Sequence, residues 1–339
     1  MTNDKTVTIS VDALGGDHAP EVVLDGVKLA LQQDSNLKVL LCGPDEVVTP
    51  FARDLNNCEA VATTEFIDMG EHPANAVRRK KDSSIVVGCR LVKEGRSQGF
   101  FSAGSTGACL AAATLVMGRI KGVKRPALFT VIPSPERHVI LGDVGANADC
   151  KPEYLLQFAK MGSVYAQNLL DIKNPRVALL NNGEEDTKGS MFAQETHNLL
   201  REKIENFAGN AEGHDVLAGK FDVYVTDGFT GNVCLKTIEG TSKVLMKAIK
   251  GVLTSSAKNK LAAAIVQKDL KTLGASMSAD TYGGAPLLGV MGACIVGHGS
   301  SNKFAIANGI HATSKIVRSE ISSKIALQIA GSANSGEKE

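Results

Sequence analysis

The sequence contains no Trp, and aromatic residues make up only 4% of it. Glycine is abundant by contrast, at 34 of the 339 residues. Because glycine allows the backbone to approach a ligand closely, this composition favours Gly-rich ligand loops. The 43% of hydrophobic residues is ordinary for a globular protein and sufficient for a sizeable core. The length fits one large domain or two modest ones.

An excess of positive charge is also missing. Lys and Arg total 37, Asp and Glu total 36, and the net charge is +1. Wholesale binding of nucleic acid is therefore excluded, because it needs a strongly basic domain. The seven Cys residues are scattered and form no C-x-x-C pair. We accordingly expect no metal site, no disulfide framework and reduced thiols in a cytoplasmic protein.

The N-terminal residues show no basic segment followed by an apolar one, so we expect no secretory leader. The longest uncharged run covers residues 97–118 and could be mistaken for a membrane span. Its first half contains three Gly residues together with Ser102, Ser105 and Thr106. Such a segment cannot be a lipid-exposed helix, and the pattern predicts a buried strand, a loop and a helix.

Short β-rich runs alternate with helical patterns along the chain. We predict strands at 7–11, 39–41, 100–101, 128–132, 139–141, 177–180, 223–225 and 294–296, with 128–141 forming a hairpin. This alternation predicts an α/β fold, a mainly parallel sheet with helices on both faces in a Rossmann-like three-layer sandwich. We expect one catalytic domain over 1–331 with a helical excursion at about 240–275 and a disordered tail at 332–339. A split into two lobes is the alternative.

Three loops share one design, at residues 101–107, 226–232 and 297–302. Each follows a predicted strand and places Gly, hydroxyl groups and free backbone N–H groups at the start of a helix. Such helix starts bind anions, although ordinary N-capping explains any single loop better. Three of them on one edge of a sheet favour an oxyanion or phosphate pocket. The P-loop and dinucleotide fingerprints are both absent, so we expect no nucleotide cofactor.

Three further loops are rich in acidic residues. Residues 12–20 hold two Asp, one His and a Gly pair, which suit a metal site, acid–base chemistry or a simple turn in which Asp17 caps a helix. Residues 141–150 form a second loop of Gly, Asp and Asn. Residues 182–189 are dense in charge, and Lys188 there is either an ion-pair partner or a phosphate or oxyanion contact.

At these loops the sequence resembles the PlsX family of phosphate acyltransferases over residues 6–319. The matching stretches include SVDALGGDHAP at 10–20, SAGSTGA at 102–108, LGDVGANADCKPEYLLQFAKMGSVYA at 141–166, GEEDTKG at 183–189, TDGFTGNVCLKTIEG at 226–240, YGGAPLLGV at 282–290 and GHGSSN at 297–302. The sequence departs from the family pattern at Ser105, in place of Asn, and at Asn182, in place of an apolar residue.

The resemblance implies a fold similar to phosphotransacetylases and isocitrate-dehydrogenase-like enzymes. It also implies a homodimer that transfers a fatty acyl group from acyl-carrier protein to inorganic phosphate, without a cofactor, for phospholipid synthesis. The acyl phosphate would pass to a membrane acyl-phosphate:glycerol-3-phosphate acyltransferase. The alternatives are a phosphotransacetylase-like enzyme that uses acyl-coenzyme A and a non-catalytic membrane-associated scaffold.

The resemblance locates the site in the loops. We expect phosphate to bind at Gly104, Ser105, Thr106 and Gly107. The catalytic candidates are Lys188, Asn232, His298, His18 and Asp227, of which the first three are expected to contact the oxyanion or the leaving group. Asp12, Asp17, Asp143 and Asn147 are expected to organise the loops.

Two basic clusters are candidates for docking the acidic carrier protein. They comprise Arg78, Arg79, Lys80 and Lys81 in one run, and Lys121, Lys124 and Arg125, with Arg119, in the other. Complementary charge mainly raises the rate of encounter. A merely solvated basic surface is the alternative for either cluster.

The predicted helical excursion is basic and amphipathic. Residues 242–271 contain seven Lys and one acid, Asp269. Apolar residues recur at helical spacing over 244–252, and Leu261 and Ile265 continue the stripe. Helices of this kind lie on anionic membranes, so we expect Leu261 and Ile265 to contact the bilayer. The alternative, packing on the core or on a dimer partner, is stronger for 244–252 than for 261–266.

Overall fold

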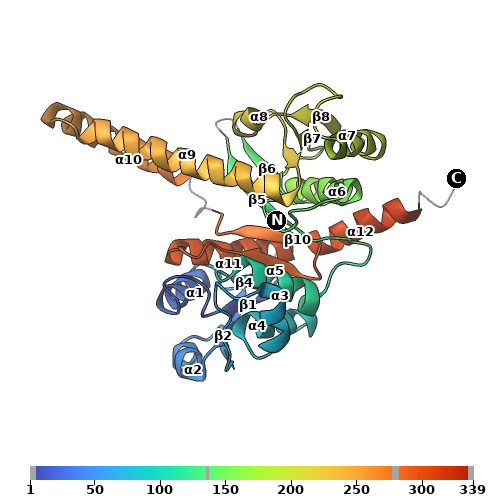
Figure 1. The fold of residues 1–339 in the computed structure, drawn as a ribbon. Coiled ribbons are helices and arrows are strands. Elements are labelled where there is room, and N and C mark those ends of the chain that lie inside the picture. Colours follow the sequence, from blue (N-terminus) through green and yellow to red (C-terminus); the bar gives the residue numbers. More distant parts are fainter. Residues whose placement is uncertain (1–4, 135–136, 277–281, 335–339) are drawn as a thin grey trace.

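The described part of the chain folds around an 11-stranded sheet (Figure 1). The computed structural model describes residues 5–134, 137–276 and 282–334. The strands are β1 (Val7–Asp12), β2 (Leu37–Gly43), β3 (Cys58–Ala62), β4 (Gly99–Ser102), β5 (Ala127–Pro133), β6 (His138–Gly142), β7 (Val177–Leu180), β8 (Phe207–Ala211), β9 (Val223–Val225), β10 (Ala285–Leu288) and β11 (Ala293–Val296). Their order in the sheet is β3-β2-β1-β4-β11-β10-β5-β6-β9-β7-β8.

Helices cover both faces of the sheet. They are α1 (Glu21–Gln33), α2 (Asp45–Arg53), α3 (Pro73–Arg79), α4 (Ser84–Lys93), α5 (Thr106–Ala112), a π-helical turn η1 (Ala113–Met117), α6 (Pro152–Leu169), α7 (Met191–Lys203), α8 (Gly213–Ala218), α9 (Gly228–Thr254), α10 (Ala257–Ser276), α11 (Lys303–Arg318) and α12 (Ile321–Asn334). Neighbouring residues of β4 show the two faces, since Phe101 belongs to the core cluster that includes residues of α1, α6 and α11, while Phe100 belongs to the cluster that includes residues of α3, α4 and α5. The predicted three-layer α/β sandwich is confirmed.

The strands change direction in the middle of the sheet. β1, β2, β3, β4 and β11 are mutually parallel, while β10 is antiparallel to both β11 and β5. β5 and β6 form the predicted antiparallel hairpin, and β6 is parallel to β9. β4 and β9 therefore run in opposite directions. The prediction that all three Gly-rich loops share one edge of a mainly parallel sheet is wrong, because three antiparallel pairings, β11 with β10, β10 with β5 and β5 with β6, separate the loops after β4 and β11 from the loop after β9.

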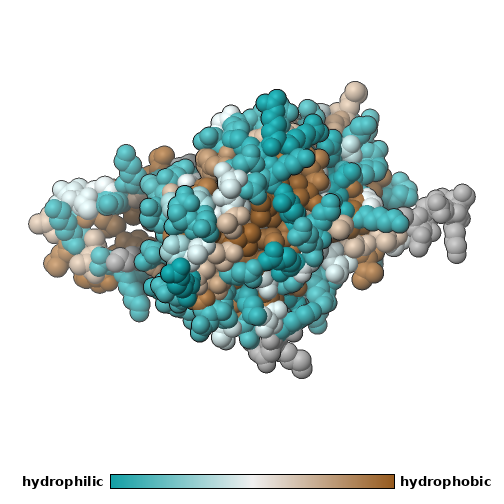
Figure 2. Space-filling view, turned by 90° about the horizontal axis from the view of Figure 1, so that it is seen from below, coloured by the Kyte–Doolittle hydropathy of each residue, from teal (hydrophilic) through white to brown (hydrophobic). Residues whose placement is uncertain are grey.

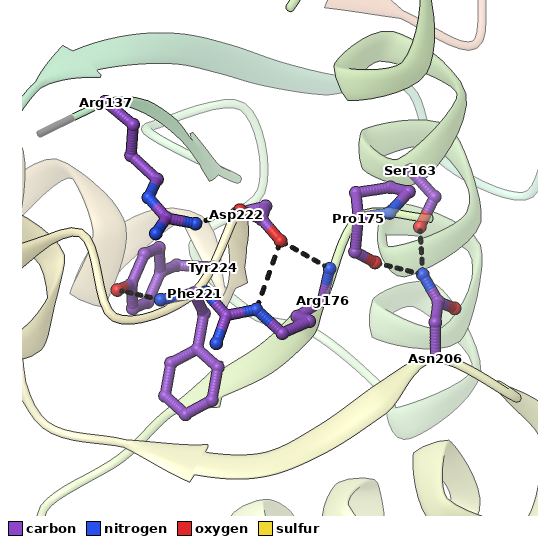
Figure 3. Close-up of polar contacts among 8 residues, drawn as sticks. All are labelled: Arg137, Ser163, Pro175, Arg176, Asn206, Phe221, Asp222 and Tyr224. Atoms are coloured by element: carbon purple, nitrogen blue, oxygen red, sulfur yellow. Dashed lines mark hydrogen bonds and ion pairs between the residues drawn. The ribbon is translucent and has the colours of Figure 1, made fainter. Parts of the chain in front are cut away.

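A buried carboxylate fastens the starts of the strands on one side of the molecule (Figure 3). Asp222 immediately precedes β9, and its Oδ2 accepts the backbone N–H of Arg176 at 2.7 Å and the Arg176 Nε at 3.4 Å. Its Oδ1 accepts a bond from Arg137 at 3.2 Å. Arg137 and Arg176 immediately precede β6 and β7. The network thus fixes the amino ends of three strands whose carboxyl ends support the loops described below.

Two long helices form an arm that projects from the body (Figure 1). α9 covers 27 residues and α10 covers 20, and they pack on each other over the stretch predicted as a helical excursion. Within the described part of the chain, no helix has both the length and the apolar character needed to cross a membrane. Of the predicted tail at 332–339, residues 332–334 belong to α12 and the remainder lies outside the described residues.

Candidate active site

A buried aspartate shapes the loops at the ends of β1, β4 and β11. The Asp12 carboxylate accepts a bond from the Ser102 hydroxyl at 2.7 Å, and that hydroxyl accepts the Gly104 N–H at 3.0 Å. Gly297 N–H donates to the Ser102 carbonyl at 2.8 Å, which ties the third loop to the second. A Cβ atom on Gly15 would lie 2.7 Å from the Gly104 nitrogen, so only glycine permits this approach. These contacts fix the loop that leads into α5.

Asp12 is buried, whereas the two other ionisable residues of its loop, Asp17 and His18, are exposed. Burial raises the pKa of Asp12, and bonds from the Ser84 and Ser102 hydroxyls lower it. Asp17 contributes its backbone N–H to the loop, which donates to the Gly299 carbonyl at 2.8 Å. α1 has no side-chain cap, so the interpretation of Asp17 as a helix cap is wrong. In the described residues, no three His, Cys, Asp or Glu side chains gather as metal ligands.

A second buried aspartate organises the loop after β6. Asp143 accepts backbone N–H bonds from Leu128 at 3.0 Å, Ala146 at 2.9 Å and Asn147 at 2.8 Å, and a further bond from the Asn147 amide at 2.8 Å. Burial raises the pKa of Asp143, and these hydrogen bonds act in the opposite direction. A Cβ on Gly231 would lie 1.9 Å from the Asp143 carbonyl oxygen. The start of α9 is thereby pressed against this loop.

The two groups of loops meet at one cavity of about 390 Å³. The first group contributes Thr106, Gly107, Gly297 and His298, the second contributes Val144, Gly145 and Asn232, and the apolar wall contains Leu110, Leu128, Leu235, Ala285 and Val296. Strand register explains how oppositely directed strands reach the same place. The last residue of β11, Val296, pairs with Ala285 at the start of β10. Leu128 of β5 pairs with Leu287 of β10, and the Leu128 N–H donates to the Asp143 carboxylate in the second group of loops. Both groups therefore end beside β5.

Side-chain capping accounts for part of each Gly-rich loop. Ser105 accepts the Ala108 N–H at 3.4 Å, Asp227 accepts the Thr230 N–H at 2.9 Å, and Asn302 caps α11. Asp227 is therefore a helix cap at the start of α9, and it does not line the cavity. Gly104 and Ser105 are buried and do not line it either. Of the four residues predicted to bind phosphate, Thr106 and Gly107 line the cavity, and their backbone N–H groups have no intrahelical acceptor.

His298 presents an imidazole to the cavity in a defined orientation. Its Nδ1 accepts the backbone N–H of Ser300 at 3.2 Å and lies 2.8 Å from the Ser300 hydroxyl. Because Nδ1 acts as an acceptor, the neutral ring carries its hydrogen on Nε2. The ring can then donate from Nε2 to an oxygen in the cavity. Asn232, two residues after the Asp227–Thr230 cap, lies on the wall formed by α9.

Two more of the predicted catalytic residues, Lys188 and His18, lie outside this cavity. Lys188 is exposed, with its N–H bonded to Glu185 and its carbonyl bonded to Asn181. Its loop borders a neighbouring hollow of about 320 Å³, which Asp227 also lines. His18 is exposed in the turn before α1. The structure thus unites Thr106, Gly107, Asn232 and His298, and leaves Lys188, His18 and Asp227 outside.

Several residues of the cavity wall were not predicted from the sequence, among them Leu235, Lys236, Glu239 and Tyr282. The first three follow Asn232 at spacings of three, four and seven along α9, so they share its helix face. That spacing was a usable signal, because it predicts which residues of α9 accompany Asn232. Tyr282 follows residues that the structure does not describe.

Solved structures with this fold define its class. A phosphotransacetylase from Streptococcus pyogenes superimposes with a TM-score of 0.58 at 16% identity, covering 93% of this chain and 94% of its own. A branched-chain phosphotransacylase from Enterococcus faecalis V583 superimposes with a TM-score of 0.58 at 15% identity, covering 91% of this chain and 99% of its own. At these identities the likeness establishes the fold alone. The protein is thus an α/β protein of the phosphotransacetylase fold.

Sequence comparison is more specific. The family model described as fatty acid synthesis protein matches residues 7–324. A phosphate acyltransferase of Desulfitobacterium hafniense (strain DSM 10664 / DCB-2) is 49% identical over 318 residues, 92% of this chain and 94% of the relative. The phosphate acyltransferase of Bacillus pumilus (strain SAFR-032) is 43% identical over 322 residues, which are 95% of this chain and 97% of the relative. The chain belongs to this family, and its resemblance to the PlsX phosphate acyltransferases, with the enzyme class that this implies, is confirmed.

Proposed function

We propose that this protein transfers a long-chain fatty acyl group from acyl-carrier protein to inorganic phosphate. The observation that supports this best is the cavity itself. It combines hydrogen-bond donors from Thr106, Gly107, Asn232 and His298 with an apolar wall. A polar end of this kind suits phosphate and a thioester carbonyl, and the apolar wall suits the first part of an acyl chain.

The reaction needs positioning more than it needs a protein nucleophile. A phosphate oxygen attacks the thioester carbonyl carbon, the carbon–sulfur bond breaks, and the thiolate of the carrier leaves as acyl phosphate forms. A thiol with a pKa of about 8.5 leaves with little protonation. The protein contributes by holding phosphate against the carbonyl and by stabilising the oxyanion that develops there.

The residues of the cavity divide into two roles. Thr106 and Gly107 bind phosphate at the start of α5, where the backbone N–H groups have no helical acceptor. His298, through Nε2–H, and Asn232, through its amide, donate to the oxyanion. Asp12, Asp17, Asp143 and Asn147 act indirectly, through the loop contacts described above. We assign no role in the chemistry to His18, Lys188 or Asp227.

Removal of the Thr106 hydroxyl tests the phosphate assignment. We expect Thr106→Ala to raise the KM for phosphate roughly tenfold, because a hydrogen bond to a charged group is lost. The KM for the acyl donor should stay within about twofold, and Thr106→Ser should restore the phosphate KM. Steady-state kinetics with each substrate varied measure both. Gly107→Val is a poorer probe, since a Cβ there would lie 2.5 Å from Pro73 and disturb α3.

Equal effects of Thr106→Ala on both substrates, or none on either, would remove Thr106 from the phosphate site. Failure of Thr106→Ser to restore the phosphate KM would also count against a hydrogen bond from this hydroxyl.

The acyl donor is tested by comparing initial rates with palmitoyl-carrier protein and palmitoyl-coenzyme A at saturating phosphate. We expect a kcat/KM at least about tenfold higher with the carrier protein, since complementary charge accelerates its encounter with the enzyme. A preference for the coenzyme A thioester would favour the phosphotransacetylase-like alternative. No phosphate-dependent turnover with either donor would favour the non-catalytic scaffold.

Of the two basic clusters, the first is better placed for carrier-protein docking. Arg78, Arg79, Lys80 and Lys81 end or follow α3, whose first residue, Pro73, packs on Gly107 of the cavity. Lys80 is paired with Glu71 at 2.6 Å. Lys121 and Lys124 instead line a groove against α6 and α12, elements of the opposite face of the sheet. Arg125 stacks over Tyr154 of α6 at 5.9 Å.

The arm supports the proposed contacts with a second subunit and with an anionic membrane surface. Val244, Leu245 and Val252 are largely exposed on α9, and Leu261 and Ile265 are 71% and 79% exposed on α10. Figure 2 shows hydrophobic surface beside hydrophilic surface on this arm, at the left of the view. We assign the α9 residues to a homodimer contact and the α10 residues to the bilayer. Release of acyl phosphate there would serve the membrane acyltransferase that consumes it.

Charge on α10 should abolish membrane binding. Wild-type protein is expected to float with anionic vesicles but not with neutral ones, and added salt should weaken binding. Leu261→Glu with Ile265→Glu should abolish flotation and leave activity without vesicles intact. Leu327→Glu makes the same change on α12, where Leu327 is 74% exposed, and serves as the control. Unchanged flotation of the double variant would rule out this segment as the anchor.

A further inference from the structure

One face of α9 turns toward the cavity. Asn232, Leu235, Lys236 and Glu239 all line it, at the spacing that places residues on one side of a helix. Among the described residues of the cavity wall, Lys236 is the only Lys or Arg and Glu239 is the only Asp or Glu. The Lys236 ammonium lies 2.8 Å from the Glu239 carboxylate. An ion pair therefore sits within the space that contains Thr106 and His298.

We propose that Lys236 binds the phosphate charge in this cavity and that Glu239 holds the ammonium until phosphate takes its place. This inference rests on the proposed function and adds a residue to it. Backbone and hydroxyl donors bind an anion but leave its charge uncompensated. A lysine ammonium supplies that compensation as a compact point charge with three donors, a common way of binding phosphate. Lys188, the cation expected from the sequence, does not line the cavity.

The exposure of the pair explains why phosphate can displace Glu239. The Lys236 side chain is 52% exposed and that of Glu239 is 24% exposed. Ion pairs this close to solvent are weak, because water screens the charges and two side chains must be ordered. Phosphate carries more charge than one carboxylate and presents more acceptor oxygens. It can therefore compete for the ammonium with additional support from the Thr106 and Gly107 N–H groups.

The same arrangement predicts opposite effects for the two partners. Without the Lys236 charge, the Glu239 carboxylate lines the phosphate cavity with no cation beside it, and like charges in one cavity repel. Without the Glu239 charge, the ammonium is free and the repulsion is gone. A pair that merely stabilised α9 would behave differently, because loss of either partner would then act in the same direction.

The test uses the full-length protein and four variants. We expect Lys236→Met to raise the phosphate KM at least about tenfold, with the acyl-donor KM within about twofold. Glu239→Gln should lower the phosphate KM by about two- to fivefold, and the double variant should lie between the two single variants. Lys28→Met removes the charge of an exposed lysine on α1 and should leave the phosphate KM unchanged.

Titration with inorganic phosphate alone, by calorimetry or ³¹P NMR, separates this inference from the proposed function, because it needs no turnover. The dissociation constants should follow the same order as the KM values. Changes of the same sign in Lys236→Met and Glu239→Gln would overturn the inference. So would a loss of kcat in Lys236→Met with unchanged phosphate binding, since the ammonium would then act on the oxyanion. Loss of turnover in the wild type would overturn the proposed function but not the phosphate result.

Discussion

Replacement of His298 by alanine is expected to lower kcat by about 10²- to 10³-fold, the usual loss when one oxyanion donor is removed. The Ser300 N–H bond to Nδ1 leaves Nε2–H of this cavity-lining residue as the donor, so His298→Ala removes a donor whose bond strengthens as the oxyanion forms. The KM values for phosphate and acyl donor should change little, because the interaction belongs to the transition state. Single-turnover kinetics with saturating phosphate measure the chemical step directly.

The control is His214→Ala, which removes a histidine that is 71% exposed on α8 and should leave kcat unaltered. A rise in phosphate KM at constant kcat would instead make His298 a phosphate ligand. Unchanged kinetics of His298→Ala would remove the residue from the mechanism.

Replacement of Asp143 by alanine is expected to lower the free energy of unfolding by about 3–5 kcal/mol. Each buried N–H group left without an acceptor costs about 1–3 kcal/mol, and Asp143 serves the backbone of Leu128, Ala146 and Asn147. Asp143→Asn keeps the shape of the side chain and one acceptor oxygen, but its NH₂ group would face backbone N–H donors. We therefore expect a smaller loss in the free energy of unfolding, about 1–3 kcal/mol. Urea denaturation followed by circular dichroism measures both.

Asp149→Ala is the matched control, because Asp149 lies in the same loop and is exposed. It should change the free energy of unfolding by less than about 0.5 kcal/mol. If Asp143→Ala were as stable as the control variant, the Asp143 hydrogen bonds would not be what holds this loop against α9.

Strands with two buried faces were predictable from the sequence. The apolar runs at 177–180 and 223–225 coincide with β7 and β9, whose residues are all buried. β3 and β8 were not predicted, because they are the two edges of the sheet and each is only partly buried. β10 was not predicted because Pro286 and the glycines around it resemble a loop, although the strand is central.

The site was predictable in its loops but not in its walls. Gly and hydroxyl residues after strands indicated the regions of Thr106, Asn232 and His298, which the structure brings to one cavity. The strand reversal at β10 and β5 depends on long-range pairing, which no local pattern reveals. For the same reason, nothing local distinguishes Lys188, outside the cavity, from Lys236, inside it.

Attack of a phosphate oxygen on the thioester carbonyl can be followed with phosphate labelled with ¹⁸O at every oxygen. The product formed from this phosphate and palmitoyl-carrier protein is analysed by mass spectrometry. We expect palmitoyl phosphate that retains all of the label, because no phosphorus–oxygen bond breaks. Free carrier thiol should appear in equal amount, and His298→Ala should suppress both. Release of palmitate without acyl phosphate, or acyl phosphate that has lost one labelled oxygen, would rule out direct attack by phosphate on the thioester.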